Sequence, residues 1–253
     1  DYSGCDTPLS LTTGDLNGDG SPDVAVANQV GNDISIFMGR FGGLPRTSEE
    51  YVVGTETRSV AVEDIDRDGV ADVVVTDTVE DHVSVFLGSG DGTFVASASY
   101  PTGQEPRFVL PVDLDGDDRL DLVVANQISS SLTVLLGNAD GTFASAPQCD
   151  SGHSPTCVAS ADLDGDGLPD LVVTNSGSDV VSVLFGNGDG TFSDRTTFGT
   201  GFGPSSVAVA DLDGDALSDL VVTNSSEGTV SLLFGDGNGS FAPRTDHSVG
   251  GYP

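Results

Sequence analysis

The chain contains no lysine and no tryptophan, and its only permanently positive side chains are eight arginines. Forty aspartates and glutamates oppose them and leave a formal net charge of −32 over 253 residues. Such a chain repels phosphate backbones and anionic lipid headgroups, which excludes nucleic acid and an anionic membrane surface as partners. No run of 18 apolar residues occurs, so the sequence predicts no membrane insertion.

Cysteine is scarce as well, and its three copies, Cys5, Cys149 and Cys157, share no spacing. They predict neither a disulfide framework nor a thiolate metal site. Cys149 and Cys157 flank one short loop, so a bond between them stays open, and Cys5 would then be left over. Cysteine therefore says little about the cellular compartment.

A nine-residue acidic stretch recurs at a fixed interval. DLDGDGLPD begins at Asp162, and related stretches begin at residues 15, 64, 113 and 211, so that each interval is 49 residues. A fixed period of this length indicates a solenoid, a propeller or an array. We therefore predict a single domain over residues 1–253, with its repeats centred on the acidic loops 15–23, 64–72, 113–121, 162–170 and 211–219.

Each unit contains four short runs with strand character, which in the fifth unit are SSVAVADL, DLVVTN, TVSLLFG and FAPRTDHSVG. The second run is nearly all apolar, as in a strand that is covered on both faces. The fourth run is polar and variable, as in an outer edge strand. Four strands in each of five repeats predict an all-β fold, a β-propeller of five four-stranded blades, with a linear β-solenoid as the runner-up.

The acidic loops follow the pattern D-x-[DN]-x-D-x-x-x-D, which offers oxygen ligands at loop positions 1, 3, 5 and 9. Position 7 varies freely, which fits a backbone carbonyl ligand. A cage of oxygens rich in carboxylates suits Ca²⁺ best, so we predict about five Ca²⁺ ions per chain. A cation also turns the repulsion between the clustered carboxylates into attraction. The predicted ligands are Asp15, Asn17, Asp19, Ser21, Asp23, Asp64, Asp66, Asp68, Val70, Asp72, Asp113, Asp115, Asp117, Arg119, Asp121, Asp162, Asp164, Asp166, Leu168, Asp170, Asp211, Asp213, Asp215, Leu217 and Asp219.

Two other interpretations explain the acidic loops less well. Asx turns that merely face water favour Asp and Gly, but they do not require acids at four fixed positions. An EF-hand begins in the same way, yet it requires flanking helices and a Glu at position 12, where all five loops have valine.

Loop position 6 ranks the five sites. A loop that turns sharply there needs a positive φ, which Gly adopts freely and Asp tolerates better than Ala. Gly20, Gly69 and Gly167 meet this demand, Asp118 meets it in part, and Ala216 does not. We expect the fourth loop to bind Ca²⁺ most tightly and the fifth to lose it first.

The acidic loop, followed by DLVVTN and VSVLFGNGDGTF, resembles the FG-GAP or VCBS-type repeat family, and the resemblance extends over all five units. It implies β-propeller blades with a Ca²⁺ in each loop between the first and second strands, as in integrin α chains and many secreted bacterial proteins. The first unit departs from the pattern, because GRFGGLP from Gly39 to Pro45 replaces the glycine-rich turn.

Function is expected on the face opposite the metal loops, where the loops between units and between the second and third runs come together. The candidate residues there are Asp6, Asn32, Arg58, Glu80, Asp81, His82, Arg107, His153, Asp179, Phe202 and Glu227. We expect a monomeric adhesion or binding module for a protein or polysaccharide. Extracellular modules bind Ca²⁺ with dissociation constants on the order of 10⁻⁴ to 10⁻³ M, so we place it outside the cell or at its surface.

Two alternatives remain open: a carbohydrate-active enzyme such as a polysaccharide lyase, and a purely structural or engineered repeat. No catalytic residue is predicted, because acids held on Ca²⁺ stay ionised and cannot act as general acids. The three histidines also fall at unrelated places in the repeat.

Overall fold

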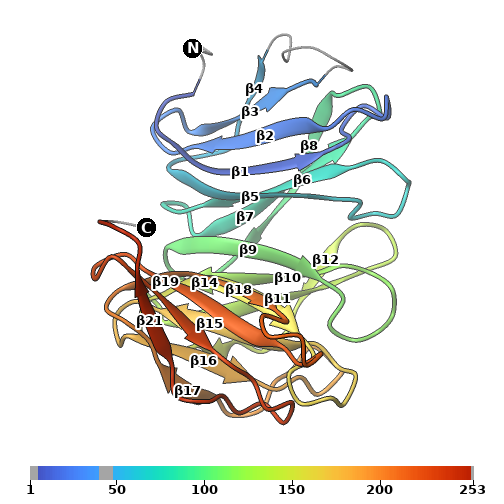
Figure 1. The fold of residues 1–253 in the computed structure, drawn as a ribbon. Coiled ribbons are helices and arrows are strands. Elements are labelled where there is room, and N and C mark those ends of the chain that lie inside the picture. The colour runs from blue at the N-terminus through green and yellow to red at the C-terminus, as the bar shows by residue number, and fades with distance from the viewer. Residues whose placement is uncertain (1–4, 40–47, 252–253) are drawn as a thin grey trace.

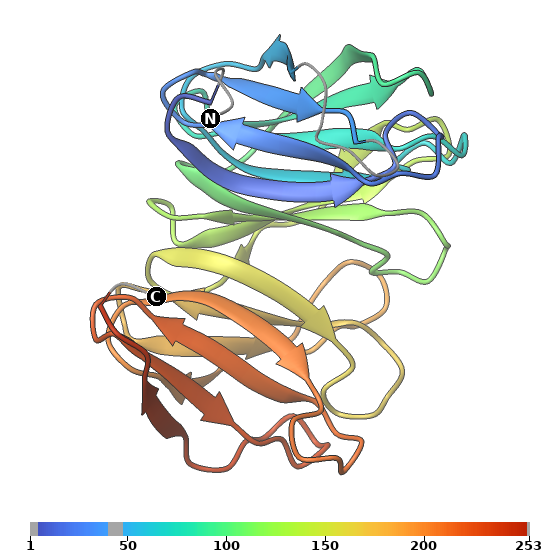
Figure 2. The same cartoon turned by 45° about the horizontal axis from the view of Figure 1, so that its top comes forward.

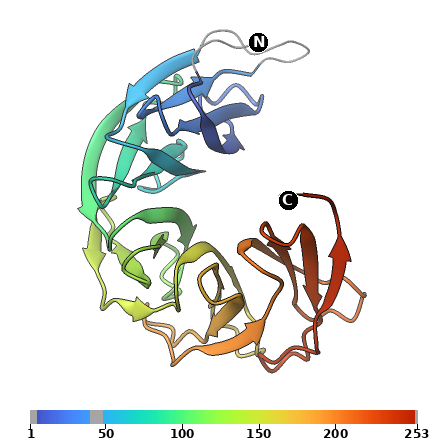
Figure 3. The same cartoon turned by 90° about the vertical axis from the view of Figure 1, so that its left-hand side faces the viewer.

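The computed structural model describes residues 5–39 and 48–251, and within these residues the chain forms strands and no helix. No segment of the described chain is therefore a helix that could span a bilayer. The strands build five antiparallel sheets, which follow one another around an arc (Figure 3). The prediction of an all-β propeller with five blades is confirmed.

The strands follow the chain in simple order within each sheet (Figure 1). The first sheet contains β1 (Pro8–Gly14), β2 (Asp23–Asn28), β3 (Asp33–Phe37) and β4 (Ser48–Val52). The second contains β5 (Thr57–Glu63), β6 (Asp72–Asp77), β7 (His82–Gly88) and β8 (Phe94–Pro101). The fourth contains β14 (Pro155–Ala161), β15 (Asp170–Asn175), β16 (Val180–Leu184) and β17 (Thr196–Gly199). The fifth contains β18 (Pro204–Ala210), β19 (Asp219–Asn224), β20 (Thr229–Leu233) and β21 (Thr245–Ser248).

The third sheet differs at its outer edge. Its inner strands are β9 (Pro106–Val112), β10 (Asp121–Asn126) and β11 (Ser131–Gly137). Two separate pieces, β12 (Phe143–Ser145) and β13 (Cys149–Asp150), both pair with β11. Pro147 lies between them, and proline interrupts a strand because it has no N–H to donate to the ladder.

Four apolar clusters hold successive sheets together, one at each junction. The second strands are almost wholly buried, as their apolar sequence predicts, and β6, β10 and β15 are buried at every position. The outer strands are largely exposed, as β8 and β21 illustrate. Each blade thus buries its inner strands against its neighbours, as expected for repeats that cannot bury a core alone.

The arc is open between the first and fifth sheets (Figure 3). Residues at the same repeat position are therefore exposed at the two ends of the arc and buried at the junctions between sheets. Leu11 of β1 is 68% exposed, whereas its equivalents in the other sheets, Val60, Val109, Val158 and Val207, are 2–7% exposed. Leu212 is 41% exposed in the fifth unit, whereas Leu16, Ile65, Leu114 and Leu163 are 1–4% exposed. The apolar pattern is the same in each unit, and only the internal junctions bury it.

The three cysteines are free, so no bond joins Cys149 to Cys157. The reason is their placement in different junctions. Cys157 lies in the core between the fourth and fifth sheets, and Cys149 packs in the core between the third and fourth. The departure of the first unit at GRFGGLP falls mainly on residues 40–45, which lie outside the described residues.

Candidate functional site

Each acidic loop joins the first strand of a sheet to the second, as predicted, and four of the five loops bring three of their carboxylates together. In four loops the oxygens at positions 1, 3 and 9 lie within 4.8 Å of one another. These groups are Asp64, Asp66 and Asp72; Asp113, Asp115 and Asp121; Asp162, Asp164 and Asp170; and Asp211, Asp213 and Asp219. In the first loop Asn17 takes position 3 between Asp15 and Asp23. The repeated acidic triads can hold metal ions.

The position 9 aspartate starts the second strand and anchors the loop. Asp170 is fully buried, and its two oxygens accept N–H groups from Leu163 at 2.8 Å and Gly186 at 2.9 Å. The equivalent aspartate makes the same two bonds in the other four units. A carboxylate offers about four lone-pair sites, so both bonds leave capacity for a cation.

Burial raises the pKa of Asp72, Asp121 and Asp170 above the usual carboxyl range, and neighbouring loop carboxylates add to the rise. Backbone N–H groups oppose it by stabilising the ionised form. A cation beside these oxygens acts in the same direction as the N–H groups, because it favours the charged carboxylate.

The remaining acidic positions shape the loop. At position 1, one oxygen of Asp162 accepts the N–H of Gly167 at 3.0 Å. At position 5, Asp166 accepts the N–H of Leu168 at 2.8 Å, and this carboxylate is not part of the triad. The ligand roles predicted for position 5 and for the position 7 carbonyls therefore stay predictions.

Position 6 has positive φ in every acidic loop. The angle is 80° at Gly20, 86° at Gly69, 65° at Asp118, 87° at Gly167 and 68° at Ala216. The expectation that Ala216 adopts a strained conformation is confirmed. Nothing lies within 4 Å of the Cβ that the glycines Gly20, Gly69 and Gly167 would carry, so the demand for glycine is conformational rather than steric.

Loop position 4 also requires a positive φ, and the sequence did not lead us to expect this. Its φ is 70° at Gly18, 63° at Arg67, 73° at Gly116, 80° at Gly165 and 88° at Gly214. Only the second loop places a non-glycine residue there. Four glycines at one repeat position were the signal that pointed to it.

The third loop carries a further feature that the sequence analysis left out. Arg119, at position 7, forms an ion pair with Asp117 and donates from Nε to the carbonyl of Gly137 at 3.0 Å. Its positive charge stands at the edge of a site that is predicted to hold a cation. The fourth loop has glycine at positions 4 and 6 and no arginine. Its rank as the tightest site stays a prediction.

On the opposite side of the sheets, three of the predicted binding residues connect blades. Asn32, Asp81 and Asp179 accept N–H groups of the next sheet's first loop, from Glu56, Glu105 and Gly203, each at 2.8 Å. All three acceptors also have positive φ, which Asn and Asp tolerate. Glu80 and Glu227 lie in loops between second and third strands, and His82 begins β7. Asp6, His153 and Phe202 lie in the segments that precede β1, β14 and β18, whereas Arg58 and Arg107, expected in loops, lie within β5 and β9.

The asparagines that end the second strands are buried and tie two strands of one blade. Asn28, Asn175 and Asn224 donate from their amides to serines of the third strand, at 2.8–2.9 Å. This arrangement agrees with the structural role expected for them rather than with a ligand site on the surface.

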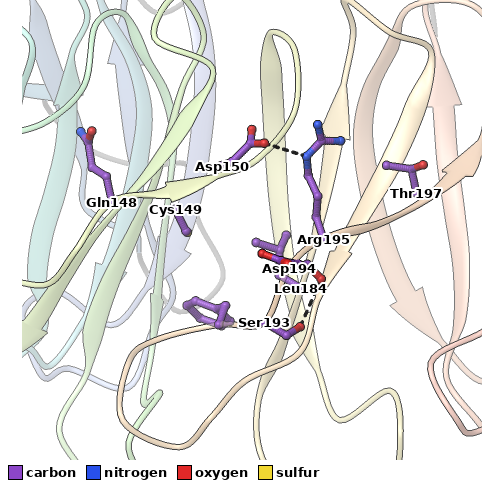
Figure 4. A pocket seen from close by; sticks show the side chains of 9 residues that line it. Gln148, Cys149, Asp150, Leu184, Ser193, Asp194, Arg195 and Thr197 are labelled. Carbon is purple, nitrogen blue, oxygen red and sulfur yellow. Dashed lines mark hydrogen bonds and ion pairs between the residues drawn. The ribbon is translucent and has the colours of Figure 1, made fainter.

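A cavity of about 560 Å³ opens between the outer edges of the third and fourth sheets. Cys149 and Asp150 of β13 line one side, and Leu184, Phe192 and Arg195 of the fourth unit line the other. Arg195 donates from Nε to Asp150 at 3.1 Å and so bridges the two sheets (Figure 4). Sequence reasoning did not find this cavity, because its walls come from two repeats.

Solved structures with the same architecture include a functionally unknown protein from Desulfotomaculum acetoxidans, at 14% identity and a TM-score of 0.71, over 94% of this chain and 69% of that one. A Lactobacillus plantarum protein has 14% identity and a TM-score of 0.74, and the match covers 98% of this chain and 73% of that one. A third structure is an Agrocybe aegerita lectin, which is described as recognising non-reducing terminal N-acetylglucosamine. It has 18% identity and a TM-score of 0.50, and the match covers 96% of this chain and 81% of that one. At these identities the likeness concerns the fold alone. No curated protein matches the chain.

The family comparison agrees with the geometry of the loops. The model of the FG-GAP-like repeat matches residues 15–75, 64–124, 113–173 and 162–222, in successive overlapping copies that begin at the first four acidic loops. These matches span most of the chain, and each contains a strand–acidic loop–strand element. The chain belongs to the FG-GAP-like repeat family.

Proposed function

We propose that the chain is a calcium-stabilised extracellular binding module. The observation that carries the proposal is the convergence of positions 1, 3 and 9 in the acidic loops, where oxygens from three carboxylates lie within 4.8 Å of one another. Like charges at this separation repel strongly, and several oxygens around one point suit Ca²⁺.

Two orphaned atoms support the fit of a cation to these loops. The Oδ1 atoms of Asp64 and Asp115 are buried and have no hydrogen-bond partner. A buried charged oxygen without a partner costs free energy, and a bound cation would remove that cost. The residues that would hold the ion are those at positions 1, 3 and 9, with position 5 and the position 7 carbonyl completing the predicted set.

The test is a count of bound metal and its effect on stability. We expect about five Ca²⁺ per chain after equilibrium dialysis, and a melting temperature that falls markedly in EGTA. Each site held at 100 times its dissociation constant contributes roughly 2.7 kcal/mol. Fewer than three ions per chain, or a melting curve that EGTA leaves unchanged, would contradict the proposal.

The partner proposed for the module is a protein or a polysaccharide. The Agrocybe aegerita lectin of similar fold is described as recognising non-reducing terminal N-acetylglucosamine, and we therefore choose a polysaccharide as the first class to test. The alternatives of a polysaccharide lyase and of a purely structural repeat are separated from it by a glycan array, with product analysis on every hit. Binding without product supports the module, and product formation supports the lyase. A blank array contradicts a polysaccharide partner and leaves the protein partner and the structural repeat.

A further inference from the structure

Three of the four junctions between sheets are closed by a pair of aromatic rings. Tyr51 packs edge-on against Phe94 with ring centroids 5.6 Å apart. Tyr100 and Phe143 lie 5.3 Å apart, and Phe198 and Phe241 lie 5.0 Å apart, in the same arrangement. In each pair the first ring comes from the outer strand of one sheet, and the second comes from the residue that directly follows the glycine-rich turn of the next sheet.

The junction between the third and fourth sheets lacks the first ring. Residues 51, 100, 149 and 198 are spaced by the 49-residue period, and position 149 is a cysteine. The second ring is present as Phe192, yet no aromatic ring of the described residues pairs with it. The cavity of about 560 Å³ is lined by both Cys149 and Phe192, so it occupies the place of the missing ring.

The same junction carries an arginine–carboxylate pair that bridges its two sheets. Arg195 and Asp150 form the only ion pair between two sheets in the described part of the chain. At the second junction the equivalent residues are Ala146 and Pro101. At the fourth junction Arg244 takes the place of Arg195, but it pairs with Asp246 of its own sheet, because Gly199 takes the place of Asp150. Arg195 uses Nε–H for Asp150, while its two terminal amino groups have no hydrogen-bond partner among the residues that the structure describes. A guanidinium has five N–H donors, so this side chain retains four for a ligand.

The polarity and charge of the cavity define its ligand. Six of the nine lining residues are polar, and only a small apolar floor, formed by Leu184 and Phe192, lies among them. Asp150 and Asp194 outnumber Arg195, and the whole chain carries a net charge of −32, which disfavours an anion. A volume of this size lies within the range of about 300–1,000 Å³ that is usual for small-molecule sites.

We propose that this cavity binds a neutral pyranose sugar. One apolar face of the ring takes the place of the missing aromatic ring against Phe192. The sugar hydroxyls accept from the terminal amino groups of Arg195 and donate to the carboxylate of Asp194. The site lies at the outer rim, between two blades, and not on the face predicted from the sequence. The inference rests on the proposed function only in its choice of a sugar as partner.

The test uses ¹⁵N-labelled protein in Ca²⁺ buffer, titrated with the methyl glycosides of glucose, galactose, mannose and N-acetylglucosamine. We expect at least one of them to shift the backbone resonances of residues 148–150 and 192–197. Cys149→Tyr restores the ring found in the other junctions, so this variant should keep its melting temperature and lose affinity at least tenfold. Arg195→Gln should also weaken binding at least tenfold without filling the cavity.

Tyr100→Cys is the matched control, because it opens the second junction, where no arginine and carboxylate face each other. It should create no new sugar site. The inference is overturned if no glycoside shifts these resonances, or if the Cys149→Tyr variant binds as tightly as the parent. It is also overturned if p-cresol binds there and the sugars do not, which would assign the cavity to an aromatic side chain of a protein. The Ca²⁺ content of each variant, measured in parallel, separates failure of this site from failure of the metal loops.

Discussion

The carboxylate of Asp81 accepts a hydrogen bond from the backbone N–H of Glu105, 2.8 Å away across the junction between the second and third sheets. The two residues belong to different repeats, and both have positive φ. This bond satisfies a backbone donor in the segment that directly precedes β9. It also connects the third sheet to the second, because the acceptor belongs to the second sheet.

We expect Asp81→Ala to lower the free energy of unfolding by about 1–3 kcal/mol, the cost of leaving a partly buried donor without a partner. Asp81→Asn should have a much smaller effect, because Asn32 makes the same bond to Glu56 one repeat earlier. Urea unfolding of the two variants measures the difference. Equal losses from Ala and Asn would mean that the negative charge, and not the hydrogen bond, is what matters.

Ala216→Gly should tighten Ca²⁺ binding in the fifth loop. The φ of 68° at Ala216 costs roughly 1 kcal/mol relative to glycine, which corresponds to an affinity change of about fivefold. Gly167→Ala is the reciprocal change in the fourth loop and should weaken that site by a similar factor. Calorimetric titration of the two variants against the parent tests both. A weaker fifth site after Ala216→Gly would refute the ranking of the loops.

Leu163 and Leu212 occupy the same repeat position but differ in burial, at 4% and 41% exposed. Leu163→Asp places a charge in the core between the fourth and fifth sheets and should cost more than about 3 kcal/mol. Leu212→Asp should cost less than about 1 kcal/mol, since that side chain already meets water. Comparable losses in thermal unfolding would show that the end face of the fifth sheet is covered in solution.

Burial raises the pKa of the Cys149 thiol to about 11. The unfolded chain releases this proton near pH 9, while the folded chain retains it, so Cys149 contributes stability that is present below about pH 9 and is lost as the pH rises toward 11. Cys149→Ser should therefore show a shallower fall in melting temperature over this interval than the parent. Parallel curves for the two proteins would show that the thiol is accessible to solvent.

Much of this molecule follows from its local sequence. The 49-residue spacing of the acidic loops, the apolar second strands and the polar outer strands predict five four-stranded blades, because each of these signals concerns residues close together in the chain. The positive φ of Ala216 was predictable for the same reason, since the turn is closed by neighbours such as Asp211, which accepts the N–H of Ala216 at 3.0 Å.

The features that depend on a neighbouring blade were decided by the tertiary structure. Leu11 and Val60 hold the same place in the apolar pattern, yet only Val60 has a sheet packed against it. The sequence placed Asp81 among the residues of a binding face, and it did not predict the hydrogen bond by which this side chain accepts the N–H of Glu105 in the next sheet. Cys149 breaks the spacing of the aromatic residues, but the cavity beside it is defined by Phe192, 43 residues further along the chain. A repeat specifies its own strands and turns, whereas the burial of apolar side chains and the cavity arise where two repeats meet, and only the packed structure brings those surfaces together.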